Sequence, residues 1–420
     1  MKSSNFSGFY KLSISERHKE VAEFCDLSQA ELDLLGQGGS LSLDVADHMI
    51  ENVIGTMSLP LGVGMNFKVN GKEYLVPMVS EEPSVVAAAS NMARLVNNTG
   101  GFLASNTGPV MRAQIQTVKV ADPFMAKQRI LAHKAELLEK ANSLDPMLVK
   151  VGGGACDLEV HIVESQRGLM LITHLIVDTR DAMGANAVNT MAEGLAPRIE
   201  ELTGGRVFLR ILSNLADLRL ARASCVVKKE DLGGEEVIEA ILEAYAFAAA
   251  DPYRAATHNK GIMNGISAAV IATGNDSRAI EAGAHAYASR SGRYTSLTTW
   301  EKNKDGDLAG TIELPMAVGL VGGATKVHPI AKIAVKMLKV ESAVELAEVI
   351  AAVGLSQNLG AIRALATEGI QRGHMSLHAR TLAATAGAPP ELLDKMAAQM
   401  ISEKNIRLER AQELLAEYRK

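Results

Sequence analysis

Apolar and polar side chains alternate in four stretches between residues 110 and 210, and this alternation predicts β-strands. A period of two residues is typical of a strand that buries one face. Two segments between these stretches have helical spacing; the first begins at Asp122-Pro123 and the second ends at paired glycines. The order β-α-β-β-α-β predicts a small ferredoxin-like domain at residues 110–210. The four strand-like stretches are RAQIQTVKVAD, DLEVHIVES, LMLITHLIVDT and RVFLRIL.

The pattern on either side of this domain is mainly helical. Ahead of it, SISERHKEVAEFC and SQAELDLLGQGG begin with capping serines, and the Asn-Gly pair of KVNGKEYLVPMV predicts a β-hairpin. After it come alanine-rich helices, a short β section, and charged helices beyond residue 370. We expect an α+β protein whose large helix-rich domain, residues 1–109 and 211–369, is interrupted by the small domain and followed by a helical domain at 370–420.

Composition narrows the class of protein. The chain has 420 residues, a net charge of −5 and a pI near 6.1, which argues against a nucleic-acid-binding protein. Its N-terminus lacks the apolar core of a secretion signal, and no apolar run approaches the ~20 residues of a membrane helix. Cys25, Cys156 and Cys225 are odd in number and scattered, as is typical of reduced thiols. We therefore expect a soluble cytoplasmic protein with no nucleic-acid or membrane partner.

The common nucleotide and metal motifs are absent from the sequence. There is no G-x-G-x-x-G, so an ordinary Rossmann site is not expected, and GLVGGATK fails the Walker spacing. No C-x-x-C pair occurs. His374 and His378 stand four residues apart, as two zinc ligands on a helix do, but the glutamate of H-E-x-x-H is missing. We expect no metal.

One glycine-rich segment has the features of a ligand-binding turn. DTRDAMGANAVNT follows an apolar strand and opens a helix, and the backbone N–H groups of such a helix can receive a phosphate or another polar group. Asp181 and Asn186 are placed to meet hydroxyls or amides of the same ligand. The alternative is an ordinary capped turn between a strand and a helix.

Lys260 is the polar residue hardest to explain by structure alone. It lies in THNKGIMNG, beside segments of core character, and a lysine there must find a carboxylate or take part in chemistry. Glu82 and Asp276 each precede a helix, where a carboxylate can also simply complement the helix N-terminus. His374 lies where a hinge beside a mobile lid would lie. Together the four side chains indicate acid–base chemistry without metal, with the lysine stabilising a carbonyl oxygen.

Seven motifs follow one another along the chain: ENVIGT (51–56), EEPSVVAAAS (81–90), DAMGAN (181–186), THNKGIMNG (257–265), GND (274–276), GLVGGATKVHP (319–329) and GHM (373–375). In this order they resemble 3-hydroxy-3-methylglutaryl-coenzyme A (HMG-CoA) reductases, and EEPSVVAAAS is similar to the form in the class II, bacterial and archaeal branch. The similarity runs from about residue 15 to residue 415, and the seven spaced motifs make it highly specific.

The resemblance implies a reaction and a role for each matched residue. Family members interconvert (S)-HMG-CoA and (R)-mevalonate plus CoA, with two hydrides from a nicotinamide cofactor. The cofactor is exchanged after the first hydride transfer, and a mobile C-terminal flap allows this exchange. By resemblance, Lys260 stabilises the oxyanion and Glu82 donates a proton. Asp276 orients and tunes both, and His374 protonates the CoA thiolate. The other matched residues are Glu51, Arg254 and Asn264 on the substrate side and Asp181, Met183, Gly184 and Asn186 in the dinucleotide segment.

Asp145 predicts the choice of cofactor. A carboxylate near the adenosine ribose accepts from a 2′-hydroxyl and repels a 2′-phosphate, and NADH-using family members resemble this sequence in having an aspartate there. We therefore predict NADH, with NADPH as a second cofactor; the alternative is that Asp145 merely starts a turn before Pro146. The resemblance also implies a homodimer with shared active sites, assembled into a hexamer as a trimer of dimers.

Two other functions remain open at the level of the sequence. One is an enzyme that forms a Schiff base between Lys260 and a carbonyl substrate, and the other is a binding or structural homologue without turnover. The presence of Glu82, Lys260, Asp276 and His374 argues against the second. Because one site serves both directions, the sequence does not distinguish synthesis of mevalonate from its consumption.

Overall fold

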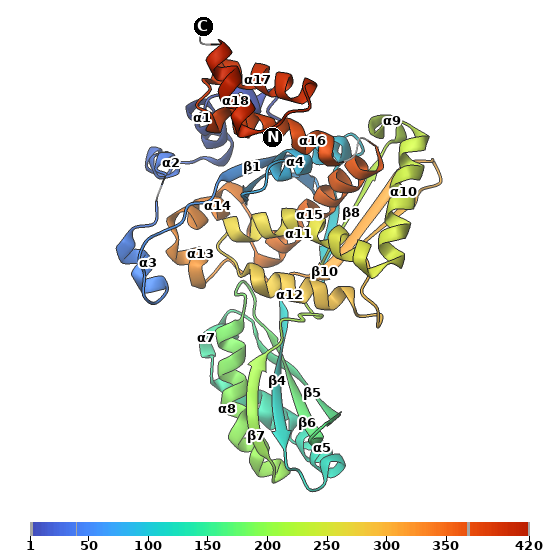
Figure 1. Ribbon diagram of the computed structural model, residues 1–420. Coiled ribbons are helices and arrows are strands. Elements are labelled where there is room, and N and C mark those ends of the chain that lie inside the picture. The colour runs from blue at the N-terminus through green and yellow to red at the C-terminus, as the bar shows by residue number, and fades with distance from the viewer. Residues whose placement is uncertain (1–2, 39, 368–369, 419–420) are drawn as a thin grey trace.

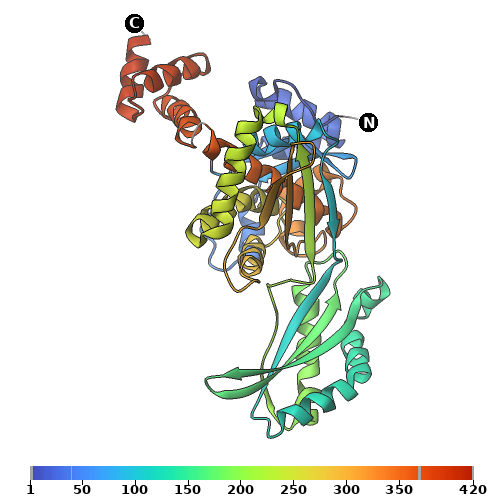
Figure 2. The same ribbon diagram turned by 90° about the vertical axis from the view of Figure 1, so that its right-hand side faces the viewer.

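The computed structural model describes residues 3–38, 40–367 and 370–418, and the side chains of all of these except 370–377. Figure 1 shows a large lobe, a small lobe that projects from it, and a group of C-terminal helices on the opposite side. Helices and sheets are both present throughout the two lobes, which confirms the expected α+β class. Figure 2 shows the C-terminal helices standing away from the large lobe.

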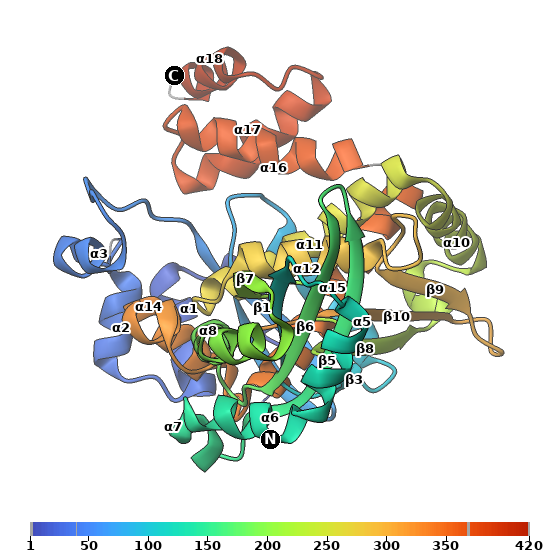
Figure 3. The same ribbon diagram turned by 90° about the horizontal axis from the view of Figure 1, so that it is seen from below.

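The small lobe is a four-stranded antiparallel sheet with helices on one face (Figures 1 and 3). Its elements are β4 (Val110–Val118), α5 (Pro123–Ala132), α6 (Lys134–Ser143), α7 (Pro146–Lys150), β5 (Gly154–Ser165), β6 (Gly168–Asp178), α8 (Ala185–Thr203) and β7 (Arg206–Leu212). The strands lie in the order β5-β6-β4-β7, so β4 and β6 are central. Helices α5, α6 and α7 connect β4 to β5, and α8 connects β6 to β7, as in a split βαβ unit. Met111, Ala113 and Ile115 of β4 are fully buried on the face that α8 covers.

One predicted helix of the small lobe is divided in the structure. The sequence pattern predicts a single helix from Pro123 through residue 142, but α5 ends at Ala132 and α6 begins at Lys134. His133 between them has φ −101° and ψ 15°, outside the helical range. Its N–H bonds the carbonyls of both Arg129 and Ile130, and its ring Nδ1 lies 2.8 Å from the Arg129 carbonyl oxygen. These bonds tighten the last turn of α5 and turn the chain into α6.

The N-terminal part of the large lobe contains the predicted hairpin and capped helices. After a short 3-10 turn, its elements are α1 (Ile14–Cys25), α2 (Gln29–Gly36), α3 (Leu43–Met49), β1 (Leu61–Val69), β2 (Lys72–Val79) and α4 (Val85–Asn97). Asn70 and Gly71 turn β1 into β2 with φ of 49° and 83°, as an Asn-Gly hairpin requires. Ser13 and Ser28 form capping boxes at the starts of α1 and α2, which confirms both predicted N-termini.

The rest of the large lobe surrounds one buried helix. Its elements are β3 (Leu103–Asn106), β8 (Leu220–Val227), α9 (Lys229–Leu232), α10 (Glu235–Ala250), α11 (Pro252–Ala272), α12 (Ser277–Ala288), β9 (Thr298–Lys302), β10 (Leu308–Pro315), α13 (Gly323–Val327), α14 (Pro329–Leu338) and α15 (Ala343–Ala366). Helix α15 packs against α4, α10, α11 and the sheet β3-β8-β10-β9. By length and composition α15 could cross a membrane, contrary to the expectation from the sequence, but 67% of its most apolar window is buried inside the fold. It is therefore the core helix of this lobe.

Three helices complete the chain and have a core of their own. They are α16 (Ile370–Thr385), α17 (Pro390–Ser402) and α18 (Leu408–Tyr418). Met396, Met400 and Leu414 are fully buried among them, in a cluster separate from the core of the large lobe. Helix α16 also contacts α15, and this contact connects the three helices to the large lobe.

Candidate active site

A carboxylate, an ammonium and an amide meet on the surface of the large lobe. Lys260 Nζ donates to Glu82 Oε2 at 2.7 Å, and Asn264 Nδ2 donates to Glu82 Oε1 at 3.2 Å. Lys260 and Asn264 are four residues apart on α11, so both donors lie on one face of the helix. The backbone N–H of Glu82 is held by Ser80 Oγ at 3.1 Å, just before α4 begins. Three predicted site residues are therefore in direct contact.

The exposure of Lys260 corrects one inference from the sequence. Its side chain is 60% exposed, although the surrounding residues suggested a buried lysine. The reason is that α11 has two faces. His258 and Asn259 point into the core, where Asn259 donates to Thr295 O and accepts from Leu297 N. The buried face thus fixes the helix, and another face presents Lys260 to solvent.

A buried polar network holds α11 and was not predicted. Trp300 Nε1 can only donate, and it lies 2.8 Å from Asn358 Oδ1, so the Asn358 amide nitrogen faces His258 Nε2 at 3.2 Å. Thr298 Oγ1 also lies 2.9 Å from that ring nitrogen. Burial, followed by the charge of Arg254, lowers the pKa of His258 to about 3, so its imidazole is neutral. The only sequence signal was a histidine two residues before Lys260, in a helix with many small and apolar residues.

Among the described side chains, Asp276, Arg254 and Glu51 make no hydrogen bond or ion pair to this group. Asp276 is the N-cap of α12, and its Oδ1 accepts from the N–H groups of Arg278 and Ala279 at 3.0 and 3.1 Å. Within the described part of the chain, no hydrogen bond or ion pair joins it to Lys260 or Glu82. Arg254 lies in the first turn of α11, and burial lowers its pKa. Glu51 is exposed in an irregular segment between α3 and β1.

The predicted dinucleotide segment forms the turn between β6 and α8. Gly184 is the N-cap of α8 with φ 104°, and a methyl group there would overlap the side chain of Thr179. No side chain caps α8, so its first N–H groups are available to an anion, with Asn186 exposed beside them. Asp181 Oδ1 accepts from the N–H of Ala343 at 2.8 Å, at the start of α15. The segment is thereby attached to the large lobe.

Asp145 caps a short helix, α7, that lies at the end of the small lobe nearer the large lobe (Figure 1). Asp145 Oδ1 accepts from Leu148 N at 2.9 Å. Figure 1 shows α7 beside the upper end of α8. The capping bond agrees with the simple structural interpretation of Asp145, and the location leaves the second interpretation, a contact with a ribose, open to test.

His374 falls on α16, and its side chain lies outside the described ones. His378, four residues later on the same helix, is described and exposed. The proposed role of His374 therefore depends on the family resemblance and on experiment.

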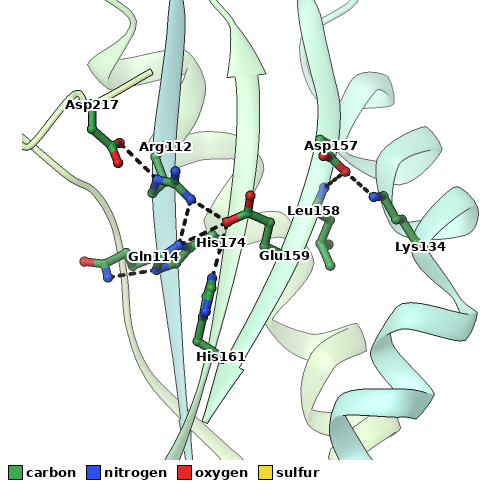
Figure 4. Close-up of polar contacts among 9 residues, drawn as sticks. All are labelled: Arg112, Gln114, Lys134, Asp157, Leu158, Glu159, His161, His174 and Asp217. Carbon is green, nitrogen blue, oxygen red and sulfur yellow. Dashed lines mark hydrogen bonds and ion pairs between the residues drawn. The ribbon is translucent and has the colours of Figure 1, made fainter. Parts of the chain in front are cut away.

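One cluster of potential metal ligands lies on the open face of the small lobe's sheet (Figure 4). Glu159, His161 and His174 bring three ligand atoms within 4.8 Å of one another. Arg112 Nη1 lies 2.7 Å from Glu159 Oε2 and 3.0 Å from His174 Nδ1, so a guanidinium already supplies positive charge there. Like charges at 4 Å repel by about 4 kcal/mol per unit charge pair near a protein surface. Burial, and then Arg112, lower the pKa of His174 to about 4. We assign no metal to this cluster.

Comparisons with known proteins agree with one another. The sequence pattern of hydroxymethylglutaryl-coenzyme A reductase matches residues 13–379. The chain is 60% identical over 418 residues to the 3-hydroxy-3-methylglutaryl-coenzyme A reductase of Archaeoglobus fulgidus. This match covers 99% of this chain and 95% of that protein. It is 34% identical over 391 residues to the probable enzyme of the same name from Borreliella burgdorferi, covering 90% and 88%.

Solved structures show the same fold. The 3-hydroxy-3-methylglutaryl-coenzyme A reductase of Streptococcus pneumoniae superposes with a TM-score of 0.85 and 44% identity, over 99% of this chain and all of that one. A second structure from the same species, a class II enzyme bound to NADPH in open conformations, has a TM-score of 0.84 and 45% identity over 86% of this chain.

Proposed function

Since the chain belongs to the hydroxymethylglutaryl-coenzyme A reductase family, we propose that it interconverts (S)-HMG-CoA and (R)-mevalonate plus CoA. The observation that carries this proposal is the contact of Glu82 with Lys260 and Asn264 across 178 residues of sequence. Lys260 is a charged donor that a rigid helix holds beside a carboxylate. Such a donor suits a reaction in which negative charge develops on a carbonyl oxygen. The cofactor supplies two hydrides, one for the thioester and one for the aldehyde that follows.

The chain's own residues hold the substrate and move protons. The ammonium of Lys260 donates to the carbonyl oxygen of the thioester, and then to that of the aldehyde, as each oxygen gains charge. Glu82, 2.7 Å from that ammonium, gives the proton that converts the second oxyanion to an alcohol. Arg254, Asn264 and Glu51 bind the hydroxymethylglutaryl group, and Asp276 orients Lys260 and tunes Glu82. His374 protonates the CoA thiolate and so prevents it from adding back.

The nicotinamide dinucleotide would bind at Asp181, Met183, Gly184 and Asn186. The uncapped N-terminus of α8 and the close approach that Gly184 permits support this site, because both suit a phosphate group. We accordingly assign residues 110–210 to a small cofactor domain, residues 1–109 and 211–369 to the substrate domain, and residues 370–420 to a flap. The NADPH bound to the Streptococcus pneumoniae enzyme supports nicotinamide as the cofactor class. We also propose that the protein is cytoplasmic.

The function is tested by steady-state kinetics of the wild-type protein. We expect oxidation of reduced cofactor that depends on HMG-CoA and releases CoA, with a higher kcat/KM for NADH than for NADPH. In the reverse direction, mevalonate and CoA should reduce the oxidised cofactor. No turnover in either direction with either cofactor would refute the proposal.

Asp145→Asn tests the cofactor preference without disturbing the fold. Asparagine is as good an N-cap as aspartate, so the bond to Leu148 N is preserved while the charge is removed. We expect kcat/KM for NADPH to rise by about tenfold, because repulsion of the 2′-phosphate is lost, and kcat/KM for NADH to change less. If Asp145 only caps α7, Asp145→Asn will leave both values unchanged, and Asp145→Ala will lower stability alone.

We propose that the active site is shared between two copies of the chain. Glu51 and the exposed apolar residues Ile54 and Met57 lie in one segment. Within the described parts of a single chain, Lys260 pairs with Glu82 and makes no hydrogen bond or ion pair to this segment. Large exposed apolar side chains close together are typical of an interface. A homodimer, assembled further into a hexamer, would bring Glu51 of one copy to Lys260 of the other.

Co-expression of two inactive variants tests this sharing. Lys260→Ala and Glu51→Ala should each be inactive alone, whereas a mixed dimer should recover part of the activity, because one of its two sites then contains both native residues. Light scattering would check that the particle mass is a multiple of two chains. A mixed dimer without activity would contradict a shared site.

A further inference from the structure

Arg219 is a buried cation at the junction of the two lobes. It precedes β8 and is only 3% exposed. Its Nη1 donates to Thr179 Oγ1 at 2.8 Å and to the carbonyl oxygens of Ala182 and Met183 at 3.1 and 3.2 Å. Its Nη2 donates to Val318 O at 2.5 Å. One guanidinium therefore bonds four acceptors, three in the turn after β6 and one in the segment after β10.

The same junction contains further contacts between the two segments. The N–H of Leu320 donates to Asp181 O at 2.8 Å, and Ala182 pairs with Val321 in a parallel bridge. Gly319 lies so close to Met183 that a side chain there would overlap the Met183 backbone nitrogen. Gly319 N in turn donates to Asn275 Oδ1 at 2.7 Å, and Asn275 is the neighbour of Asp276. The proposed dinucleotide segment is thus connected, through one short segment, to a proposed catalytic residue.

We propose that Arg219 is a positioning residue for the nicotinamide dinucleotide, holding Thr179–Met183 against the large lobe so that the cofactor faces the carbonyl carbon bound at Lys260. The proposal rests on the proposed function. Arg219 does not itself touch the cofactor; it acts through the backbone that precedes Gly184 and α8. Hydride transfer depends steeply on distance, so a small displacement of this segment has a large effect on rate.

The chemistry of the side chain explains why arginine is needed. Arg219 offers donors in a planar fork that reaches both sides of the junction at once, whereas a lysine concentrates its donors at one atom. Burial lowers the pKa of Arg219 to about 10, against the effect of the nearby Asp178 and Asp181 carboxylates, so the guanidinium stays charged at neutral pH. Four acceptors around it compensate for the loss of water.

Arg219→Lys tests the proposal, with Arg222→Lys as the matched control. Arg222 lies three residues later on β8 and pairs with Glu313 on the surface, away from the junction. We expect Arg219→Lys to weaken dinucleotide binding, measured directly by titration, by about tenfold, because bonds from a charged donor are lost. Its kcat should fall as well, while the KM for HMG-CoA stays near the wild-type value. Arg222→Lys should match the wild type in all three.

Thr179→Val is a milder second variant. It removes one acceptor of Arg219, together with the hydroxyl's own bonds to the carbonyl oxygens of Pro109 and Ala182, and nearly preserves the shape of the side chain. Its control is Thr173→Val on β6, since the Thr173 hydroxyl is equally buried and makes no hydrogen bond among the described residues. We expect Thr179→Val, and not Thr173→Val, to raise the dinucleotide Kd. If Arg219→Lys does not fold, the comparison of these two threonine variants tests the proposal.

Wild-type affinity for the dinucleotide in Thr179→Val, or in a folded Arg219→Lys, would overturn the inference. An equal loss of affinity in the two threonine variants would also overturn it, because a general loss of packing would then explain the effect. The failure of the proposed function gives a different result, namely a wild-type protein that neither binds the dinucleotide nor reduces HMG-CoA.

Discussion

Lys260→Ala will abolish turnover and leave the fold intact. The lysine is the cation proposed to meet the oxyanion, and loss of one oxyanion donor lowers the rate by about 10²–10³-fold, with a larger loss for a charged donor. The effect on stability is much smaller. Lys260 is 60% exposed, and a surface ion pair contributes at most about 1 kcal/mol. Alanine also keeps the propensity of α11 to form a helix.

Lys336→Ala is the matched control for this experiment. Lys336 lies on α14, is similarly exposed, and pairs with Glu31 at the same 2.7 Å. Both variants should therefore melt within a few degrees of the wild type, and only Lys260→Ala should lose turnover. Near-normal turnover in Lys260→Ala would refute the mechanism. Trapping of substrate on Lys260 by borohydride would instead favour the Schiff-base alternative.

The sequence predicted those features that depend on short-range rules. The alternation of the small lobe's strands, the capping serines Ser13 and Ser28 and the Asn70-Gly71 turn all have their expected structures. Helix α15 is one of the alanine-rich helices expected after the small domain. The division at His133 was not predicted, because the residues on both sides of it continue one helical pattern and the deviation comes from bonds to Arg129 and Ile130.

Only part of the candidate site could be predicted, because its residues lie far apart in the sequence. Lys260 stood out as a polar residue beside segments of core character, Glu82 as a carboxylate before a helix, and Asn264 by the family resemblance, but nothing local shows that α4 and α11 lie side by side. The exposure of Lys260 was misjudged because apolar neighbours in a helix can all lie on its other face. Arg219 gave no signal at all, since its partners are mainly backbone carbonyls, which no sequence pattern reveals.

The surroundings of Asp276 and Glu51 could not be predicted from the sequence either. Asp276 caps α12, as the simpler interpretation of its position predicted, and its proposed role requires a contact beyond that cap. A catalytic group and a helix cap use the same carboxylate chemistry, so the sequence cannot separate them. Glu51 lies outside regular structure, where neither period nor propensity predicts a side chain's surroundings.

His374→Gln will separate the two halves of the reaction. If His374 protonates the CoA thiolate, its loss should slow reduction of the thioester by about 10²–10⁴-fold, the usual contribution of a general acid. Reduction of free mevaldehyde should be nearly unaffected, because that step expels no thiolate. The measurement is kcat for HMG-CoA and for mevaldehyde with the same variant and cofactor.

His378→Gln controls for the helix that carries both residues. It makes the same substitution one helical turn later on α16, at an exposed position, so any general effect on the flap should appear in both variants. We expect His378→Gln to retain wild-type kcat for both substrates. Equal losses for HMG-CoA and mevaldehyde in His374→Gln would assign the histidine a role other than protonating the thiolate, because the aldehyde step would then depend on it as strongly as the thioester step.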